Sequence, residues 1–271
     1  MEIVRNGEGL KVAADTVSPI KVNDIRIDMF ERGTGRPLLF LHPGIGLDPA
    51  ARVFERLAAR FRVLAPSHPG FGNSELPKGF DTVDDLAYFY LDLMEQLDLR
   101  EVVLAGVSLG GWVAAAIAVK STERLSKLVL ANAVGIKVGD RETRDIVDIF
   151  AVTEKMFNEL AYSDPSIAAR DYKAMPDNEV RAVARNREST ARYAWSPYMH
   201  DPKLRGRLHR IRIPTLFLRG AADRITTEQY GRAYCGAIPG ARFEAMPNAG
   251  HFPHIEQPDE FARRVIAFAE G

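Results

Sequence analysis

A serine flanked by two glycines stands in the stretch GVSLG around Ser108. The mostly apolar residues 102–106 predict a buried strand, and residues 109–119, apolar nearly all round, predict a central helix. Such an abrupt turn holds the serine exposed in strained geometry, and Gly106 and Gly110 relieve the crowding on either side of it. The helix N-terminus offers free N–H groups to an anion. A tight turn with a capping serine is compatible with the same sequence, but the strand-turn-helix context favours a nucleophile.

A serine hydroxyl needs a positioned base, and that base needs an orienting acid. Among six histidines, His251 is favoured as the base because it follows the last predicted strand, in NAGHFPHIEQP. From there it reaches the sheet edge from a separate loop. His254 lies three residues after His251, and the pair could form a metal site of the H-x-x-H type. Pro253 between them disfavours two ligands on one helical face. We therefore expect no metal.

The acid is expected at Asp223, in the stretch TLFLRGAADRI, where it follows a predicted strand and no other carboxylate shares its loop. A lone loop aspartate is more often a turn or cap residue. The other position from which an acid could orient the histidine, at the end of residues 128–132, holds Asn132, whose amide is no carboxylate. Asp223 is therefore favoured.

Backbone N–H groups are expected to stabilise the oxyanion that forms when the serine attacks. One should belong to Leu109, directly after the serine. The other should come from the loop LHPGIG, where Pro43 has no N–H, so that Gly44 is the first choice and Ile45 the second. His42 in this loop is expected to be structural.

Short apolar strands alternate with amphipathic helices along the chain, which predicts an α/β fold with a mostly parallel sheet. The stretch 20–30 predicts a hairpin that turns at Asn23 and Asp24. Further strands are predicted at 38–41, 62–66, 102–106, 128–132, 215–219 and 241–246.

No strand is predicted between about residues 135 and 208, where helical patterns and charges are dense. We therefore expect a core of residues 1–134 and 209–271 with a helical cap, 135–208, inserted over the carboxyl edge of the sheet. Substrate contacts are expected from Ile45, Trp195, Tyr198 and Phe252; for Trp195 and Tyr198, packing within the cap is an equal alternative.

The composition excludes some partners. Lys plus Arg and Asp plus Glu number 36 each, so no net field recruits nucleic acid or an anionic membrane. The single cysteine, Cys235, allows no intrachain disulfide. The first ten residues lack a signal-peptide core, and the apolar run 113–119 is too short to span a bilayer. We expect a soluble cytoplasmic protein; a homodimer stays open.

With Ser108, Asp223 and His251 in this order, and with the stretches LHPGIG and HPGFGNS, residues 20–270 resemble the α/β-hydrolase fold enzymes. The resemblance implies an eight-stranded, mostly parallel sheet with helices on both faces and a cap after the sixth strand. The chain departs from many relatives at Pro43, where they have glycine, and at Ser67, where they have an acid.

The resemblance and the motifs together predict a serine hydrolase that cleaves a small or medium carboxylic ester with water. No cofactor is expected. The nucleophile separates the chain from the dehalogenases and epoxide hydrolases of this fold, which use aspartate. Hydrolysis of a carbon–carbon bond in a ring-cleavage dienoate is the nearest alternative, although LHPGIG lacks the extended Gly-Ser-Gly-Pro-Gly loop. A lactonase, an amide hydrolase and a non-catalytic small-molecule receptor also remain open.

Overall fold

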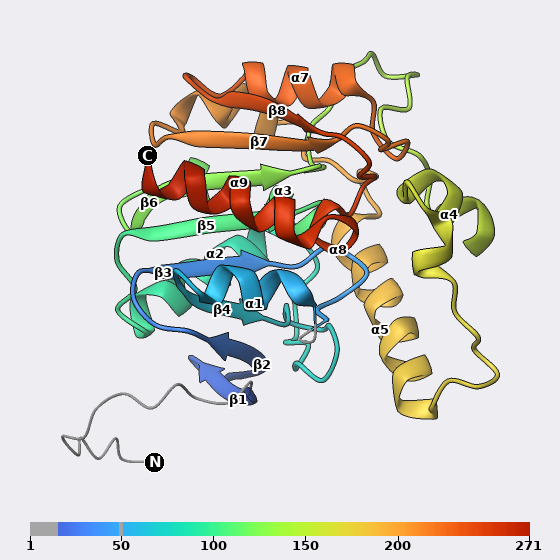
Figure 1. Ribbon diagram of the computed structural model, residues 1–271, viewed down its shortest axis with the longest axis horizontal. Coiled ribbons are helices and arrows are strands. Elements are labelled where there is room, and N and C mark those ends of the chain that lie inside the picture. Colours follow the sequence, from blue (N-terminus) through green and yellow to red (C-terminus); the bar gives the residue numbers. More distant parts are fainter. Residues whose placement is uncertain (1–15, 49–50) are drawn as a thin grey trace.

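An eight-stranded sheet forms the centre of the protein (Figure 1). The computed structural model describes residues 16–48 and 51–271, so the first ten residues, whose composition argued against a signal peptide, lie outside it. The strands lie in the order β1-β2-β4-β3-β5-β6-β7-β8. They are β1 (Thr16–Val22), β2 (Ile25–Arg32), β3 (Pro37–Leu41), β4 (Arg62–Pro66), β5 (Val102–Val107), β6 (Leu125–Ala131), β7 (Thr215–Gly220) and β8 (Arg242–Met246).

The sheet is mostly parallel, as the sequence predicts. Strand β2 pairs antiparallel with β1 and with β4, and all the other pairings are parallel. The hairpin between β1 and β2 turns at Asn23, whose φ of 50° lies in the left-handed region that asparagine tolerates. Strands β5 and β7 are buried along their whole length, which explains why they read as unbroken apolar runs.

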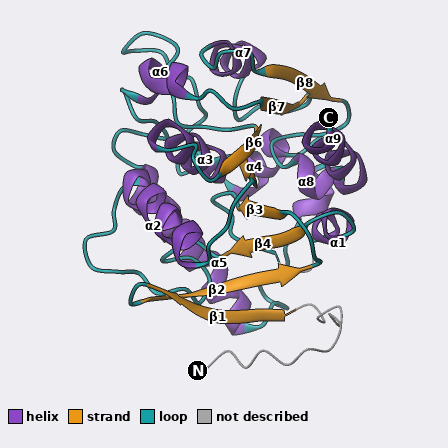
Figure 2. Ribbon diagram, turned by 90° about the vertical axis from the view of Figure 1, so that its left-hand side faces the viewer, coloured by secondary structure: helices purple, strands orange, loops and turns teal. Residues whose placement is uncertain are grey.

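Helices cover both faces of the sheet (Figure 2). Helices α1 (Arg52–Ala58) and α9 (Pro258–Glu270) pack together on one face, and α2 (Val83–Gln96) and α3 (Leu109–Lys120) on the other. Helix α7 (Glu228–Gly236) packs against β7 and β8. Helix α3 is buried from Leu109 to Ala118, because small residues let it lie closely on the strands. Among the described residues, none of the helices is long and apolar enough to cross a membrane.

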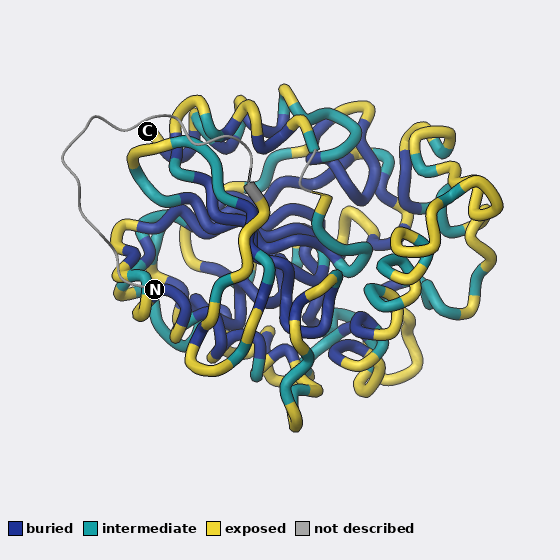
Figure 3. The backbone as a smooth tube through the Cα atoms, turned by 90° about the horizontal axis from the view of Figure 1, so that it is seen from below, coloured by how far each residue is buried: buried dark blue, intermediate teal, exposed yellow. Residues whose placement is uncertain are grey.

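The segment between β6 and β7 contains helices and loops. Its elements are α4 (Glu154–Ala161), η1 (Pro165–Ala168), α5 (Asp177–Ala194), α6 (Leu204–Arg207) and η2 (Leu208–Arg210). Helices α4 and α5 stand beyond the carboxyl ends of the strands rather than on a face of the sheet (Figure 1). Seen from below, buried strands fill the middle of the molecule and exposed backbone dominates this outer segment (Figure 3). The edge of the sheet where ligands bind in open α/β folds therefore lies under α4 and α5.

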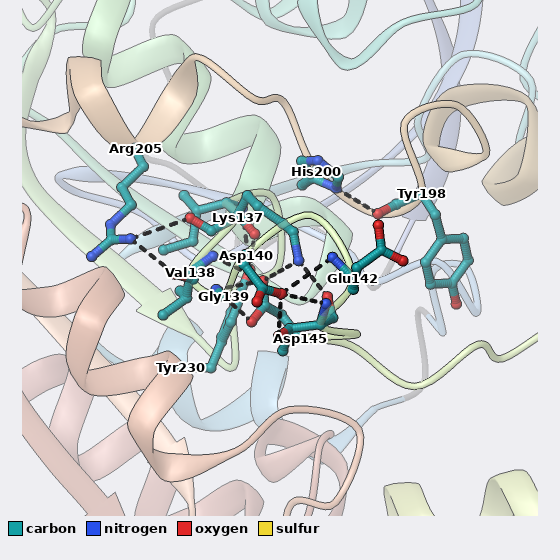
Figure 4. A network of polar contacts seen from close by, with 12 residues as sticks. Lys137, Val138, Gly139, Asp140, Glu142, Asp145, Tyr198, His200, Arg205 and Tyr230 are labelled. Carbon is teal, nitrogen blue, oxygen red and sulfur yellow. Dashed lines mark hydrogen bonds and ion pairs between the residues drawn. The ribbon is translucent and has the colours of Figure 1, made fainter.

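A polar loop leads from β6 into this segment (Figure 4). Its centre is the Asp145 carboxylate, which accepts hydrogen bonds from the backbone N–H groups of Val138 at 2.8 Å and Gly139 at 2.9 Å and pairs with Lys137 Nζ at 3.1 Å. Burial alone would raise the pKa of Asp145, but these bonds outweigh it and hold the pKa below its usual value. The charged carboxylate thus fixes the path of the chain before α4.

Candidate active site

The turn between β5 and α3 carries Ser108 in a strained backbone conformation, with φ 53° and ψ −114°. A side chain at position 106 would overlap the Gly110 carbonyl oxygen. One at position 110 would overlap the end of β3 at Leu41 and come within 2.6 Å of the His42 carbonyl oxygen. Both glycines are therefore required for this turn, and the second makes room for the neighbouring strand.

Three predicted residues from three separate loops meet at this turn. His251, in the loop after β8, places Nε2 at 2.8 Å from Ser108 Oγ. Its Nδ1 lies 2.9 Å from Oδ2 of Asp223, in the loop after β7. His251 and Asp223 are buried, whereas Ser108 is half-buried. A hydroxyl, an imidazole and a carboxylate thus form one hydrogen-bonded chain that ends at an accessible oxygen.

The carboxylate in this chain is held in its charged form. Burial alone would raise the pKa of Asp223, but the His251 charge and hydrogen bonds outweigh it and keep the pKa below its usual value. These bonds come from His251, from Thr226 Oγ1 at 2.8 Å and from the Ile225 N–H at 2.8 Å. An acceptor on the Nδ1 side requires the proton of a neutral imidazole to sit there. Nε2 is then free to accept the serine proton.

The alternative acid position has a structural role. Asn132 is buried, and its amide donates to the Gly250 carbonyl at 2.8 Å and accepts from the Gly220 N–H at 3.2 Å. It therefore ties the end of β7 to the loop that carries the histidine.

The loop from His42 to Gly46 passes next to the serine. The Gly46 N–H donates to the Pro43 carbonyl at 3.0 Å, and His42 Nδ1 lies 2.7 Å from the same oxygen. His42 Nε2 accepts from the His68 N–H at 2.9 Å, and burial lowers the pKa of His42 to about 4. His42 thus stays neutral and joins two loops, as expected of a structural histidine.

Both candidate oxyanion donors of this loop, Gly44 and Ile45, line the cavity above Ser108 together with Leu109. In residues 16–48 and 51–271, the N–H groups of these three residues have no hydrogen-bond acceptor within the chain. Three residues with unpaired N–H donors therefore line the same cavity as Ser108, and the choice between Gly44 and Ile45 stays a prediction.

The cavity above the serine is mostly apolar. Phe252 and Ile45, both predicted to contact substrate, line it. Phe252 packs against Phe157 and Tyr162 from α4 and the residue after it, so core and cap side chains share one wall. Other lining residues are Val134, Ile146, Ile149, Phe150, Met199 and Ile225, with the polar Glu154, Asn158, Arg170 and Arg187 among them.

Trp195 and Tyr198, also expected to contact substrate, are not among the residues that line this cavity, and a substrate contact from them stays a prediction. Trp195 is 57% exposed, and both residues line a neighbouring pocket instead. The Tyr198 hydroxyl accepts from the Ile149 N–H and donates to the Val147 carbonyl, each at 2.8 Å. Both rings contact Phe150, which does line the cavity. The two aromatics therefore support the cavity wall from behind.

Several residues that hold the site in place carry no motif. The buried Arg219 in β7 donates to the carbonyl oxygens of Asp223 at 3.0 Å and Thr226 at 3.3 Å, which shapes the acid loop. At the end of α4, the Ala161 carbonyl accepts from the His251 N–H at 2.6 Å. Helix α5 contributes Asn186 and Thr190, whose side chains hydrogen-bond to the loop of Gly44 and Ile45. Polar residues at helical spacing along α5 were the one signal in the sequence that could have indicated a packed polar face, and they do not identify the partner loop.

His254 does not share the site of His251. It is buried against Phe40 and Phe261, and its Nδ1 has no partner among the described residues. Within the described ranges, no three His, Cys, Asp or Glu side chains converge on a point that could hold a metal ion.

Comparison with known proteins identifies the family of the chain. The model of the alpha/beta hydrolase family matches residues 38–264. A 2-hydroxymuconate semialdehyde hydrolase from Pseudomonas sp. (strain CF600) is 26% identical over 265 residues, which cover 90% of each chain. A 3-oxoadipate enol-lactonase from Acinetobacter baylyi is 23% identical over 226 residues, 79% of this chain and 81% of that protein.

Solved structures share the fold. An esterase from Exiguobacterium antarcticum has a TM-score of 0.76 at 21% identity, covering 94% of this chain and 100% of that one. A meta-cleavage product hydrolase from Pseudomonas fluorescens IP01 has the same TM-score and identity, with 93% and 97% covered. Because the family model spans most of its length, this chain belongs to the alpha/beta hydrolase family and is a hydrolase.

Proposed function

We propose that the protein hydrolyses carboxylic esters through a Ser108–His251–Asp223 triad and a covalent acyl-enzyme, without a cofactor. The observation that carries the proposal is the continuous chain of contacts, 2.8 Å from serine to histidine and 2.9 Å from histidine to aspartate, under an apolar cavity. The hydroxyl ends this chain at the cavity, where a substrate carbonyl can reach it.

In the first half of the reaction, Ser108 Oγ bonds to the ester carbonyl carbon while its proton passes to His251 Nε2. The carbonyl oxygen becomes an oxyanion beside the N–H of Leu109 and that of Gly44 or Ile45. The carbon–oxygen bond to the alcohol then breaks, and the alcohol leaves with the proton from His251. The acyl group stays on the serine.

In the second half, His251 takes a proton from water, and the resulting hydroxide oxygen bonds to the acyl carbon. The bond to Ser108 Oγ breaks, the proton returns to the serine oxygen, and the carboxylic acid leaves. Asp223 stays charged throughout and stabilises the imidazolium.

Carbon–carbon bond hydrolysis of a dienoate is the second candidate, because a 2-hydroxy-6-oxo-2,4-heptadienoate hydrolase from Pseudomonas putida is 26% identical to this chain. Two exposed cations of the cavity wall, Arg170 and Arg187, also offer partners for a substrate carboxylate. Arg187 is partly engaged, since it donates to the Ile149 carbonyl at 3.2 Å and stacks on Phe150.

A series of p-nitrophenyl esters of increasing acyl length, run beside a ring-cleavage dienoate, tests the choice. The proposal expects kcat/KM for an ester to exceed that for the dienoate by at least tenfold. Phe157→Ala, which opens the apolar wall, should change the ranking of short against long esters by about 10–200-fold. Tyr88→Ala is the matched control and should leave the ranking unchanged, because this exposed ring on α2 lies outside the cavity. A dienoate preferred over every ester would replace the proposal with the second candidate.

A further inference from the structure

One face of helix α5 is hydrogen-bonded to two loops of the core. Ser189 Oγ donates to the Gly70 carbonyl at 2.7 Å, and the Tyr193 hydroxyl donates to the Pro69 carbonyl at 3.0 Å. Thr190, the next residue, and Asn186, one turn before it, contact the loop of Gly44 and Ile45 instead. The same helix face therefore carries two sets of bonds, only one of which touches the loop beside the nucleophile.

Thr190 contacts the carbonyl that lies between the two candidate donors. Its Oγ1 lies 2.7 Å from the Gly44 carbonyl oxygen and 2.9 Å from that of Asn186. The Asn186 carbonyl also has the N–H four residues further along the helix as a donor. Among the described residues, the Gly44 carbonyl has no donor besides Thr190. We therefore assign the single proton of the Thr190 hydroxyl to the hydrogen bond with the Gly44 carbonyl.

That hydrogen bond fixes the direction of a neighbouring N–H. In a trans peptide the C=O and the following N–H lie in one plane and point to opposite sides. Anchoring the Gly44 carbonyl on Thr190 therefore turns the Ile45 N–H away from α5. The preceding plane, with the Gly44 N–H, is fixed in the same way through the Pro43 carbonyl and its bonds from Gly46 and His42.

Asn186 holds the other end of the loop. Its Nδ2 donates to the Ile45 carbonyl at 3.0 Å, and its Oδ1 accepts from the Gly72 N–H at 2.9 Å. The helix packs so closely here that a side chain at position 44 would come within 2.8 Å of Thr190 Oγ1, and one at position 46 within 2.8 Å of Asn186 Cγ. Glycine at positions 44 and 46 thus lets the helix lie close to the loop. Thr190 and Asn186 then orient the loop through their hydrogen bonds.

We infer that Thr190 and Asn186 are positioning residues of the oxyanion site: they hold the Gly44–Ile45 peptide so that its N–H faces the oxygen of the tetrahedral intermediate. The inference rests on the proposed function and assigns the cap helix a part in the chemistry. Removing the Thr190 hydroxyl leaves both N–H donors in place but lets the Gly44–Ile45 peptide plane, which carries the Ile45 N–H, rotate. The loss should therefore be smaller than the roughly 10²–10³-fold loss that follows deletion of an oxyanion donor.

The test compares Thr190→Val, which keeps the shape and loses the hydroxyl, with Thr190→Ser, which keeps the hydroxyl. Thr190→Val should lower kcat by about tenfold with KM within about twofold, and Thr190→Ser should stay close to wild type. Ser189→Ala is the matched control, because it removes a buried bond of the same helix face to Gly70 rather than to Gly44. It should lower the melting temperature without changing kcat, where kcat is calculated from the concentration of enzyme whose Ser108 a fluorophosphonate can label.

A second readout does not depend on the substrate. The rate at which a fluorophosphonate labels Ser108 should fall in Thr190→Val in parallel with kcat, because its phosphoryl oxygen needs the same donors. Affinity for a trifluoromethyl ketone, which forms a tetrahedral adduct, should weaken by the same factor, whereas affinity for a product carboxylate should not change.

Wild-type labelling separates the two proposals. If Ser108 is labelled in wild type and Thr190→Val is labelled equally fast, the positioning role is wrong and the proposed function stands. Loss of labelling in Thr190→Ser equal to that in Thr190→Val would also overturn the role of the hydroxyl. If Ser108 is not labelled in wild type, both proposals fail.

Discussion

In the proposed triad, none of the three side chains can catalyse ester hydrolysis alone. Ser108 needs the unprotonated Nε2 of His251, and that nitrogen is free because Asp223 holds the proton on Nδ1. Asp223 in turn stays charged because its interactions with His251, Thr226 and Ile225 outweigh the effect of burial on its pKa. The proposed activity therefore depends on the charge of one buried carboxylate.

Replacing Asp223 by asparagine should preserve the fold and lower kcat by very roughly 10⁴-fold, by analogy with a serine protease triad. The amide keeps the size of the side chain but allows the wrong imidazole tautomer. Steady-state kinetics and a melting curve of Asp223→Asn measure the two effects. Asp140→Asn is the control, because Asp140 is exposed and contacts only its own loop. Near-normal activity in Asp223→Asn with a large loss in Asp140→Asn would show that the acid is misassigned.

The meeting of these three residues was predictable because each follows a strand in a recognisable stretch. For Trp195, the sequence shows only that it lies near the return of the chain to the sheet, because spacing does not reveal which way a ring points; the structure places it beside a neighbouring pocket. The hydroxyl of neighbouring Tyr198 is taken up by backbone groups at 147 and 149, which keeps both rings behind Phe150.

At the level of elements, the site depends on how tightly strand β5 turns into helix α3. Gly106 lies against the backbone of Gly110, and Gly110 against the end of β3, so the turn has no room for a methyl group at either position. The strand and the helix are buried on all sides, and neither can move to make that room.

Gly106→Ala should therefore lower the free energy of unfolding by about 1–3 kcal/mol and reduce kcat, because the displaced turn carries the nucleophile. Urea unfolding and ester kinetics provide the measurements. Gly236→Ala, at the end of α7, is the matched control: nothing lies within 4 Å of an added Cβ there. It should be neutral or slightly stabilising. Equal stability of the two alanine variants would contradict the close packing at the turn.

Strands and the central helix were predictable from apolar runs, since burial on both faces leaves that pattern in the sequence. The attachment of α5 to the core could not be predicted from the sequence. Its contacts are hydrogen bonds from polar side chains to backbone groups of loops more than 100 positions away, such as Arg185 to Gly70 at 2.9 Å. No periodicity identifies a partner at that distance along the chain.

For the molecule as a whole, three buried histidines affect its stability toward acid. Burial lowers the pKa of His42 to about 4 and that of His254 to about 3, the latter also through the charges of His251 and His42. Burial, with the charge of His42, also holds the pKa of His68 well below its usual value. In the unfolded chain each histidine takes up a proton near pH 6.5. Between about pH 6.5 and 4 the unfolded state therefore binds more protons, and the folded state loses stability as the pH falls.

His254→Leu should reduce this acid sensitivity. Its Nδ1 is unpaired among the described residues, so an apolar side chain at this site loses no hydrogen bond of that nitrogen. Between pH 7.5 and 5.5 the variant should lose about 1 kcal/mol less unfolding free energy than wild type, since one pKa unit corresponds to about 1.4 kcal/mol. Urea unfolding at both pH values measures the difference. His209→Gln, at an exposed position, should match wild type, and an unchanged pH dependence in His254→Leu would refute the assignment.

The central claim, that Ser108 forms an acyl-enzyme, is tested most directly by mass spectrometry of the protein during turnover of a p-nitrophenyl ester. The account predicts a burst of about one equivalent of nitrophenol and an added acyl mass on the peptide that contains Ser108. In Ser108→Ala the adduct and the burst should vanish, kcat should fall on the order of 10⁴-fold or more, and the melting temperature should stay near wild type. Turnover of the ester by folded Ser108→Ala at a rate near that of wild type, or an acyl group on another residue, would contradict it.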